Sequence, residues 1–133
     1  MSHDGKVAVV TGAGRNIGEA IAHRLADEGM AIAVVDLDQG RADKVVSDLT
    51  QRGVSAAAFV CDVSSPEQIE TTVGDIHTHF GRIDILVNNV AISDNKNILD
   101  IDLATWQRTL NITLTAPFYF AKCVAHKMVE DQT

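Results

Sequence analysis

The sequence predicts an α/β fold in which helices pack on both faces of a parallel β-sheet. Three observations lead to this prediction. Four short apolar runs alternate with segments whose apolar residues recur every three or four positions, the pattern of buried strands and amphipathic helices. Glycines stand at the ends of the helical segments, and a glycine-rich turn joins the first apolar run to the first helical one. This alternation indicates a doubly wound sheet with right-handed crossovers.

The first strand and the first helix flank the glycine-rich turn. Residues 7–10 are a short, continuous run of mainly β-branched side chains, as expected of a strand buried on both faces. Beyond the turn, Ile17, Ile21 and Leu25 recur four positions apart and predict the apolar face of a helix. Gly29 ends that helix, because glycine adopts the backbone conformation of a helix carboxyl end without strain.

The next two units repeat this order. The second and third strands are predicted at residues 31–37 and 55–63. The helix between them ends at Gly53. Ser65 is a suitable N-cap for the third helix, with Pro66 at the first helical position, and Gly81 ends that helix.

A fourth strand and a long helix complete the series. The strand is predicted at residues 83–89. The apolar face of the helix is marked by Trp106, Leu110, Leu114, Phe118, Ala121 and Ala125. Pro117 has no N–H to donate to the Thr113 carbonyl, so we expect a bend or break near residues 111–113. The aromatic residues, Trp106 among them, are expected in the core.

The glycine-rich turn contains Gly12, Gly14 and Gly18. A helix amino end presents unpaired N–H groups and partial positive charge, and glycines let a phosphate approach them. Glycines in such turns can also serve only to allow positive φ. Asp36 strengthens the phosphate interpretation, because a carboxylate at the end of the second strand can accept hydrogen bonds from an adenosine ribose. The alternative is that Asp36 merely opens a turn. Together these features predict a dinucleotide site in a Rossmann-type fold.

Composition and charge argue against several kinds of partner. The formal net charge of −7 disfavours nucleic acid and anionic membranes. No apolar run approaches the length of a membrane span, and the amino terminus does not resemble a signal peptide. Cys61 and Cys123 lie in apolar surroundings, which indicates buried thiols and a cytoplasmic location. His77 and His79 point to different sides of a helix, so no metal site is expected.

Over essentially its whole length the sequence resembles the classical short-chain dehydrogenases/reductases. The family pattern Thr-Gly-x-x-x-Gly-x-Gly matches residues 11–18, with Asn16 in place of the middle glycine. Asparagine tolerates a left-handed backbone, so the turn keeps its geometry while a side chain comes close to the cofactor. The resemblance implies that this turn binds NAD or NADP. Its cofactor-binding residues are then Gly12, Gly14, Arg15, Asn16, Ile17 and Gly18.

Three further stretches match the same family. Cys61–Val63 resembles the segment whose aspartate, here Asp62, flanks the adenine ring. Residues 88–91, Asn-Asn-Val-Ala, resemble the Asn-Asn-Ala-Gly after the fourth strand. Taken alone, Asp62 is equally consistent with a strand-ending residue, and the asparagines with loop residues. Asn111 falls where the family carries an active-site asparagine, which holds the helix kink and a water linked to a catalytic lysine. The further cofactor-binding residues implied are Leu37, Cys61, Asp62, Val63, Asn89, Val90 and Ala91.

The resemblance also bears on the choice of cofactor. Asp36 would bond a free ribose 2′-hydroxyl and repel a 2′-phosphate. Arg15, in contrast, resembles the basic residue of NADP-preferring members. Leu37, directly after Asp36, offers no second cation to offset the carboxylate. We therefore expect NAD, with NADP less favoured.

The catalytic serine, tyrosine and lysine of the family have no counterpart here. Tyr119 has Lys122 three residues on, where the family needs four, and it fits a helix as a packing residue. Without a fifth strand, the fourth would expose an apolar edge. We therefore expect residues 1–133 to be a single NAD(P)-binding Rossmann domain, the amino-terminal part of a longer domain whose sheet is incomplete after the long helix.

The resemblance implies an oxidoreductase that interconverts an alcohol and a ketone or aldehyde by hydride transfer. It also implies a small-molecule substrate and a homodimer or homotetramer formed through the long helix. An alternative is a non-catalytic dinucleotide-binding module or regulatory partner that lacks the catalytic tyrosine and lysine. A methyltransferase that binds S-adenosylmethionine in the same turn is weaker, because residues 88–91 and Asn111 would then have no explanation.

Overall fold

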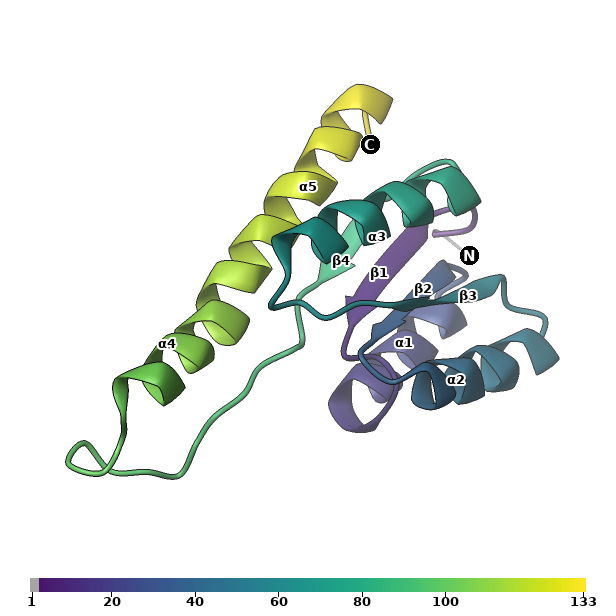
Figure 1. The fold of residues 1–133 in the computed structure, drawn as a ribbon. Helices are drawn as coiled ribbons and strands as arrows, with labels where there is room; N and C mark the ends of the chain where they lie inside the picture. Colours follow the sequence, from purple (N-terminus) through teal and green to yellow (C-terminus); the bar gives the residue numbers. More distant parts are fainter. Residues whose placement is uncertain (1–2) are drawn as a thin grey trace.

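Four parallel strands form one sheet in the order β3-β2-β1-β4 (Figure 1) in the computed structural model, which describes residues 3–133. The strands are β1 (Val7–Thr11), β2 (Ala31–Asp36), β3 (Ala56–Val60) and β4 (Ile85–Val87). The helices are α1 (Asn16–Asp27), α2 (Gln39–Gln51), α3 (Pro66–Phe80), α4 (Leu103–Leu110), the π-helical turn η1 (Asn111–Thr115) and α5 (Ala116–Asp131). The predicted α/β class, with a parallel Rossmann-type sheet, is confirmed.

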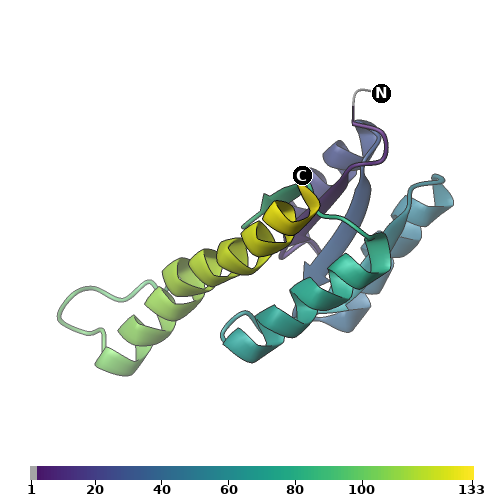
Figure 2. The ribbon, with the colours of Figure 1, turned by 90° about the horizontal axis from the view of Figure 1, so that it is seen from above.

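Side chains alternate between two apolar layers, one on each face of the sheet. Ala8 and Val10 of β1 pack with α1 and α2, whereas Val9 packs with α3 and α5. Figure 1 shows these two helix pairs on opposite sides of the sheet, and Figure 2 shows α5 running beside α3. Both faces of β1 are covered, so the four apolar residues Val7–Val10 are buried. Thr11, the last residue of β1, is buried as well, with its hydroxyl hydrogen-bonded.

Three strands are shorter than the apolar runs that predict them. β2 ends at Asp36, β3 spans five residues and β4 spans three. β4 pairs with β1 alone, from Ala8 opposite Ile85 to Val10 opposite Val87. An apolar run marks burial, whereas a strand extends only as far as its neighbour can supply hydrogen bonds. The flanking residues 88–89 and 61–63 are therefore free to form the loops of the site.

The long helix absorbs Pro117 without a break. Between α4 and α5, the N–H of Ala116 donates to the carbonyl of Asn111, five residues back, which is the hydrogen bond of a π-helix. A π-helical turn contains one residue more than an α-helical turn. The helix can therefore continue although Pro117 has no N–H to donate, and the proline ring does not crowd the Thr113 carbonyl. The sequence predicts a bend or break near residues 111–113. The structure has instead the π-helical turn η1 at this place, with right-handed helical backbone at both of its ends.

The predicted core face of this helix is wrong. The side chains that α5 and η1 bury are Ile112, Ala116, Phe120 and Val124. The predicted face is exposed instead, including Trp106 at 50%, Leu114 at 66% and Phe118 at 64% exposure. Both faces are apolar, so periodicity alone could not decide which one meets α3 and the sheet.

Asp84 ties the start of β4 to β1 at the amino end of the sheet. Its Oδ2 accepts hydrogen bonds from the Val7 N–H and the Arg82 Nε–H, both at 2.9 Å. Burial alone would raise the pKa of this carboxyl, but the hydrogen bonds from Arg82 and Val7 outweigh it and hold the pKa below its ordinary value. The ionised form therefore stabilises the β1–β4 pairing.

We predict that Asp84→Asn lowers the free energy of unfolding at neutral pH by about 1–3 kcal/mol, because charge-assisted hydrogen bonds are lost. Since the folded pKa is lowered, this stabilisation is present above about pH 4 and is lost as the pH falls through the folded value. Urea unfolding of both proteins from neutral to acidic pH measures it. Asp43→Asn, at an exposed side chain of α2, is the control. A difference between wild type and D84N that does not shrink in acid would contradict the prediction.

Candidate functional site

Gly12 and Gly18 bring the turn after β1 into direct contact with the start of α1. A Cβ built on Gly18 would lie 2.1 Å from the Gly12 carbonyl oxygen and 2.7 Å from the Asn89 Nδ2 atom. Gly12 has φ +64°, and a Cβ there would lie 2.9 Å from the same Nδ2. No side chain fits at either position. These two glycines are therefore required by packing, and Gly12 also by its backbone conformation.

The amino end of α1 differs from those of α2, α3 and α4. In these three helices the side chain of the N-cap residue, Asp38, Ser65 or Asp102, accepts a hydrogen bond from a backbone N–H of the first turn. Arg15, at the N-cap of α1, makes no such bond. The first backbone hydrogen bond of this end runs from the Glu19 N–H to the Arg15 carbonyl, at 3.2 Å. The N–H groups of residues 16–18 precede it, so they can bind an anion.

Asn16 adopts the left-handed backbone that its place in the turn requires. Its φ is +52°, and its side chain is exposed at the mouth of the turn. Asparagine is the non-glycine residue that best tolerates this conformation. The prediction that Asn16 preserves the geometry of the turn is confirmed.

Asp36 connects the end of β2 to the turn. It is 7% exposed. Its Oδ2 accepts from the Gly14 N–H and its Oδ1 from the Asp38 N–H, both at 2.9 Å. A Cβ on Gly14 would lie 2.7 Å from Oδ2, so glycine is needed here for the carboxylate to come close. Asp36 thus opens the turn after β2, as the alternative interpretation of this residue expects. Each carboxylate oxygen can accept more than one hydrogen bond, so Asp36 can also accept from a ligand.

The segment after β4 is fastened to the turn by Thr11. Thr11 Oγ1 accepts from the N–H groups of Asn89 (3.0 Å) and Val90 (3.3 Å), and it donates to the Val87 carbonyl (3.4 Å). The Asn89 side chain donates to the Gly12 carbonyl, and Asn88 donates to the carbonyl of Pro117. The loops after β1 and β4 therefore form one unit.

Two adjoining cavities lie at the carboxyl ends of the strands. The first, of about 430 Å³, is lined by Gly12, Arg15, Asn16, Ile17, Asp36, Leu37, Arg41, Asn89, Val90, Ala91 and Ile92. The second, of about 270 Å³, is lined by Gly12, Val35, Asp36, Leu37, Cys61, Asp62, Val63, Ser64, Val90, Ile92, Arg108 and Ile112. The structure thus brings together all the predicted cofactor residues, with Gly14 and Gly18 in the backbone beneath.

Asp62 carries a fixed negative charge in the second cavity. Ser64 donates to its Oδ1 from both the hydroxyl (2.6 Å) and the backbone N–H (3.0 Å). These hydrogen bonds hold the pKa of Asp62 below its ordinary value, with a smaller contribution from Arg108. The Asp62 carboxylate is therefore a hydrogen-bond acceptor at one edge of the cavity, and Val63 and Ile112 form an apolar part of its wall.

Asn111 lies in η1 but lines neither cavity. Its Nδ2 donates to the Ser64 carbonyl at 3.4 Å. Thr113, two residues further on in η1, contacts the loop after β4. Its Oγ1 donates to the Ile92 carbonyl at 3.0 Å and accepts from the Ile92 N–H at 3.1 Å. The role predicted for Asn111 stays a prediction. Thr113 is the side chain that joins η1 to the loop.

Sequence reasoning missed Thr113, Arg41 and Arg108. Arg41 belongs to α2 and Arg108 to α4, yet both line the cavities at the strand ends. No local motif marks Arg41 or Arg108, because each lies on a helix away from the motifs at the strand ends and meets them only in the folded chain. A signal was available only for Thr113, whose place beside Pro117 coincides with the predicted helix disturbance.

Tyr119 lies away from the cavities. Its hydroxyl donates to the Glu70 carboxylate of α3, and this bond raises the pKa of Tyr119 to about 12. Such a phenol stays protonated at neutral pH. The structure agrees with the interpretation of Tyr119 as a packing residue.

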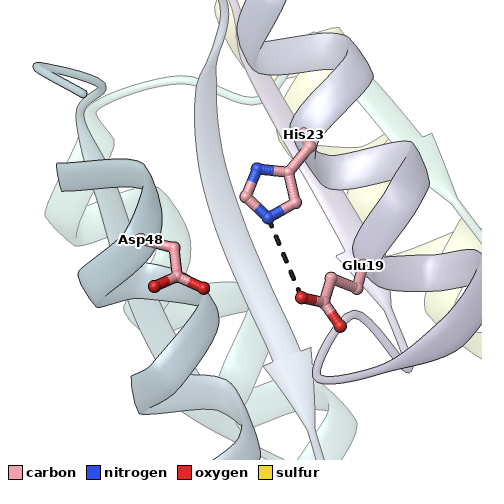
Figure 3. A group of neighbouring side chains, drawn as sticks. All are labelled: Glu19, His23 and Asp48. Carbon is pink, nitrogen blue, oxygen red and sulfur yellow. Dashed lines mark ion pairs between the residues drawn. The ribbon is translucent and has the colours of Figure 1, made fainter. Parts of the chain in front are cut away.

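Glu19 and His23 of α1 and Asp48 of α2 form a separate cluster (Figure 3). One potential ligand atom from each lies within 4.8 Å of the others, and His23 Nε2 is 3.9 Å from Glu19 Oε1. Cationic side chains already reach these atoms: Lys44 Nζ is 3.0 Å from Asp48, and Arg52 Nη1 is 3.0 Å from His23 Nδ1. The cluster is accounted for as an ion-pair network between two helices, and the absence of a metal site stays a prediction.

No helix in residues 3–133 is both long enough and apolar enough to cross a bilayer.

Among known proteins, the family described as short chain dehydrogenase matches residues 6–133. An uncharacterized oxidoreductase of Thermotoga maritima is 32% identical, over 96% of this chain and 50% of its own length. D-threitol dehydrogenase of Mycolicibacterium smegmatis is 36% identical, over 96% and 49%.

Solved structures are similar over the same region. NAD⁺-bound xylitol dehydrogenase matches with a TM-score of 0.93 and 38% identity, covering 98% of this chain and 51% of that one. A metagenomic short-chain oxidoreductase in complex with NADP matches with a TM-score of 0.93 and 29% identity, covering 99% and 60%. The chain therefore spans about half the length of the curated relatives it matches.

We predict that Gly18→Ala lowers the free energy of unfolding by about 1–3 kcal/mol, because its Cβ must push the Gly12 carbonyl away. Gly74→Ala is the matched control, since Gly74 also lies in a helix and an added Cβ meets nothing within 4 Å. That change should instead stabilise the protein by about 0.5–1 kcal/mol. Denaturant unfolding measures both. Equal effects of the two substitutions would show that the Gly12–Gly18 contact is not a constraint.

Proposed function

This chain belongs to the short-chain dehydrogenase family, and we propose that it forms the dinucleotide-binding half of an NAD-dependent oxidoreductase. The proposed reaction interconverts an alcohol and a ketone or aldehyde. One observation carries the proposal: the uncapped amino end of α1 opens on the same cavity as the Asp36 carboxylate. An anion site beside a hydrogen-bond acceptor fits a diphosphate joined to a ribose.

The described residues fit a nicotinamide dinucleotide in three places. The N–H groups of residues 16–18 would hold the diphosphate. Because Gly12 and Gly18 have no side chains, the diphosphate could approach the backbone closely. Asp36 would accept hydrogen bonds from the adenosine ribose. Val63 and Ile112 would cover the adenine, with Asp62 at its edge. When bound, the dinucleotide supplies the hydride donor or acceptor of the reaction.

The chain would also position the reacting end of the site. Thr11 fixes the loop after β4 against the turn, and Thr113 fixes the same loop against η1. Asn111 would act here through the π-helical turn, whose shifted backbone hydrogen bonds leave carbonyls for a bound water. No Tyr-x-x-x-Lys occurs in residues 1–133, so the proton-transferring tyrosine would lie outside them. We accordingly propose that these residues are the amino-terminal part of a longer Rossmann domain.

NAD is the proposed cofactor because Asp36 is buried and ionisable at the ribose position. Removing it should therefore weaken NAD preferentially. We predict that Asp36→Ala lowers the ratio of NADH affinity to NADPH affinity by at least about tenfold. Calorimetric titration of the purified protein with each dinucleotide measures the ratio, and Asp43→Ala on α2 is the charge-matched control. An unchanged ratio would contradict the role of Asp36, and no binding of either dinucleotide to wild type would refute the proposed function.

A second candidate is a non-catalytic dinucleotide-binding module. The lack of a Tyr-x-x-x-Lys pattern favours it. The edge of β4 opposes it, because Ile85–Val87 pair on one side only within residues 3–133. NADH binding without turnover of any alcohol or carbonyl compound would favour this module over the enzyme.

We further propose that the protein is a homo-oligomer in the cytoplasm and that copies pair through the long helix. Five exposed apolar residues support this interface: Leu103, Trp106, Leu110, Leu114 and Phe118. They lie three or four positions apart and form a continuous stripe along α4, η1 and the start of α5. The cytoplasmic location is supported by the two free cysteines, Cys61 and Cys123.

We predict that the double variant Leu114→Lys, Phe118→Lys weakens self-association by at least about a hundredfold, because two apolar contacts become charged. Light scattering after size exclusion measures the mass over a range of concentrations. Val129→Lys is the control, since Val129 is 78% exposed near the end of α5, outside the stripe. An oligomer of the variant that persists at the same concentrations as wild type would contradict the interface.

A further inference from the structure

The segment after β4 forms a wall that the two cavities share. Val90 and Ile92 line both the cavity of about 430 Å³ and the cavity of about 270 Å³, and Ala91 between them lines the first. A dinucleotide that fills both cavities, as the proposed function requires, contacts this segment in each of them. The position of Ile92 therefore affects the shape of both cavities.

One hydroxyl group holds Ile92 in place. The Ile92 N–H donates to Thr113 Oγ1 at 3.1 Å, and the Ile92 carbonyl accepts from the same oxygen at 3.0 Å. Val90 is held separately, by Thr11. Within residues 3–133, the backbone of residues 91–95 makes no other hydrogen bond to another segment. Beyond Val90, the wall is thus anchored through its backbone at Thr113.

Thr109 contacts the same segment less directly. Its hydroxyl lies 3.3 Å from Asp94 Oδ2 and 2.9 Å from the Thr105 carbonyl of its own helix. A hydroxyl has a single hydrogen to donate, and the shorter of these contacts is the one to Thr105. Thr113 is therefore the principal link between the long helix and residues 91–95.

The Thr113 hydroxyl suits this position because it can donate and accept at the same time. It fixes the peptide groups on both sides of Ile92, and with them the direction of the Ile92 side chain. Thr113 itself lines neither cavity, and it is exposed rather than part of the core. An effect of Thr113 on ligand binding must therefore act through Ile92.

We infer that Thr113 is a positioning residue for the dinucleotide. Its hydroxyl keeps Ile92 where a ligand in either cavity contacts it. Without this hydroxyl, the ligand itself has to order residues 91–95, and that ordering costs binding free energy. The inference rests on the proposed function. It adds that one side chain outside the cavities controls the affinity for the dinucleotide.

The test is calorimetric titration of the purified protein with NADH. Thr113→Val has nearly the same shape but removes both hydrogen bonds, so it should weaken NADH binding by at least about fivefold. Thr113→Ser keeps the hydroxyl and should stay within about twofold of wild type. Thr115→Val is the matched control, since Thr115 is exposed in the same π-helical turn and its side chain makes no capping hydrogen bond.

Amide hydrogen exchange, followed by NMR without any ligand, separates positioning from a general loss of stability. In T113V the Ile92 N–H should exchange at least about fivefold faster than in wild type, because its acceptor is gone. The N–H groups of Val9 and Val10 in β1 should exchange at the wild-type rate. Faster exchange in β1 as well would show that the whole fold is weakened, and would overturn the inference.

The titrations distinguish the inference from the proposed function. If wild type binds NADH and T113V binds it equally well, the inference fails while the proposed function stands. The same holds if T113S loses as much affinity as T113V, or if T115V loses as much. If wild type binds no NADH, both fail.

Discussion

The structure depends on the contact between the Gly12 carbonyl and Gly18. At 2.1 Å from a hypothetical Cβ, this approach is possible only for glycine. It sets α1 close against the end of β1, so the helix amino end points into the cavities and its first N–H groups remain without partners. The same contact forms the surface on which the Asn89 side chain rests. The same close contact between Gly12 and Gly18 therefore positions both the amino end of α1 and the loop after β4.

The position of the site follows from the order of the strands. After β1 the chain moves outward through β2 and β3, and it then returns to place β4 on the other side of β1 (Figure 1). The helices that follow β1 and β4 consequently lie on opposite faces of the sheet, and an opening remains at the carboxyl ends of these strands. Thr11 and Thr113 close the back of that opening with hydrogen bonds to residues 89–92. The adjoining cavity of about 270 Å³ lies toward β3, where Cys61, Asp62 and Val63 follow the strand.

Charge at the site is arranged by elements distant in sequence. Asp36 receives two backbone N–H groups and one guanidinium, from the glycine turn, the start of the α2 loop and α2 itself. The electrostatic surroundings of Asp36 are therefore not evident from Asp36 and Leu37 alone. Likewise, the amide of Asn111 is directed to Ser64, whereas Thr113 takes the place beside the loop. Residues two positions apart lie on different sides of a helix, so Asn111 and Thr113 contact different segments.

The sequence by itself determined the strand and helix order, the glycine turn, the N-cap Ser65 with Pro66 after it, and the disturbance ahead of Pro117. Each of these is a local property, set by periodicity, φ preference or a missing N–H. It also indicated most of the residues that line the two cavities, because motifs at strand ends converge at one edge of a parallel sheet. Only the tertiary structure decided that Ile112 and Phe120, and not Trp106 and Phe118, are buried, that β4 pairs over three residues, and that Arg41 neutralises Asp36. These outcomes depend on which surfaces meet across a crossover, and the spacing of residues along one chain segment does not encode that.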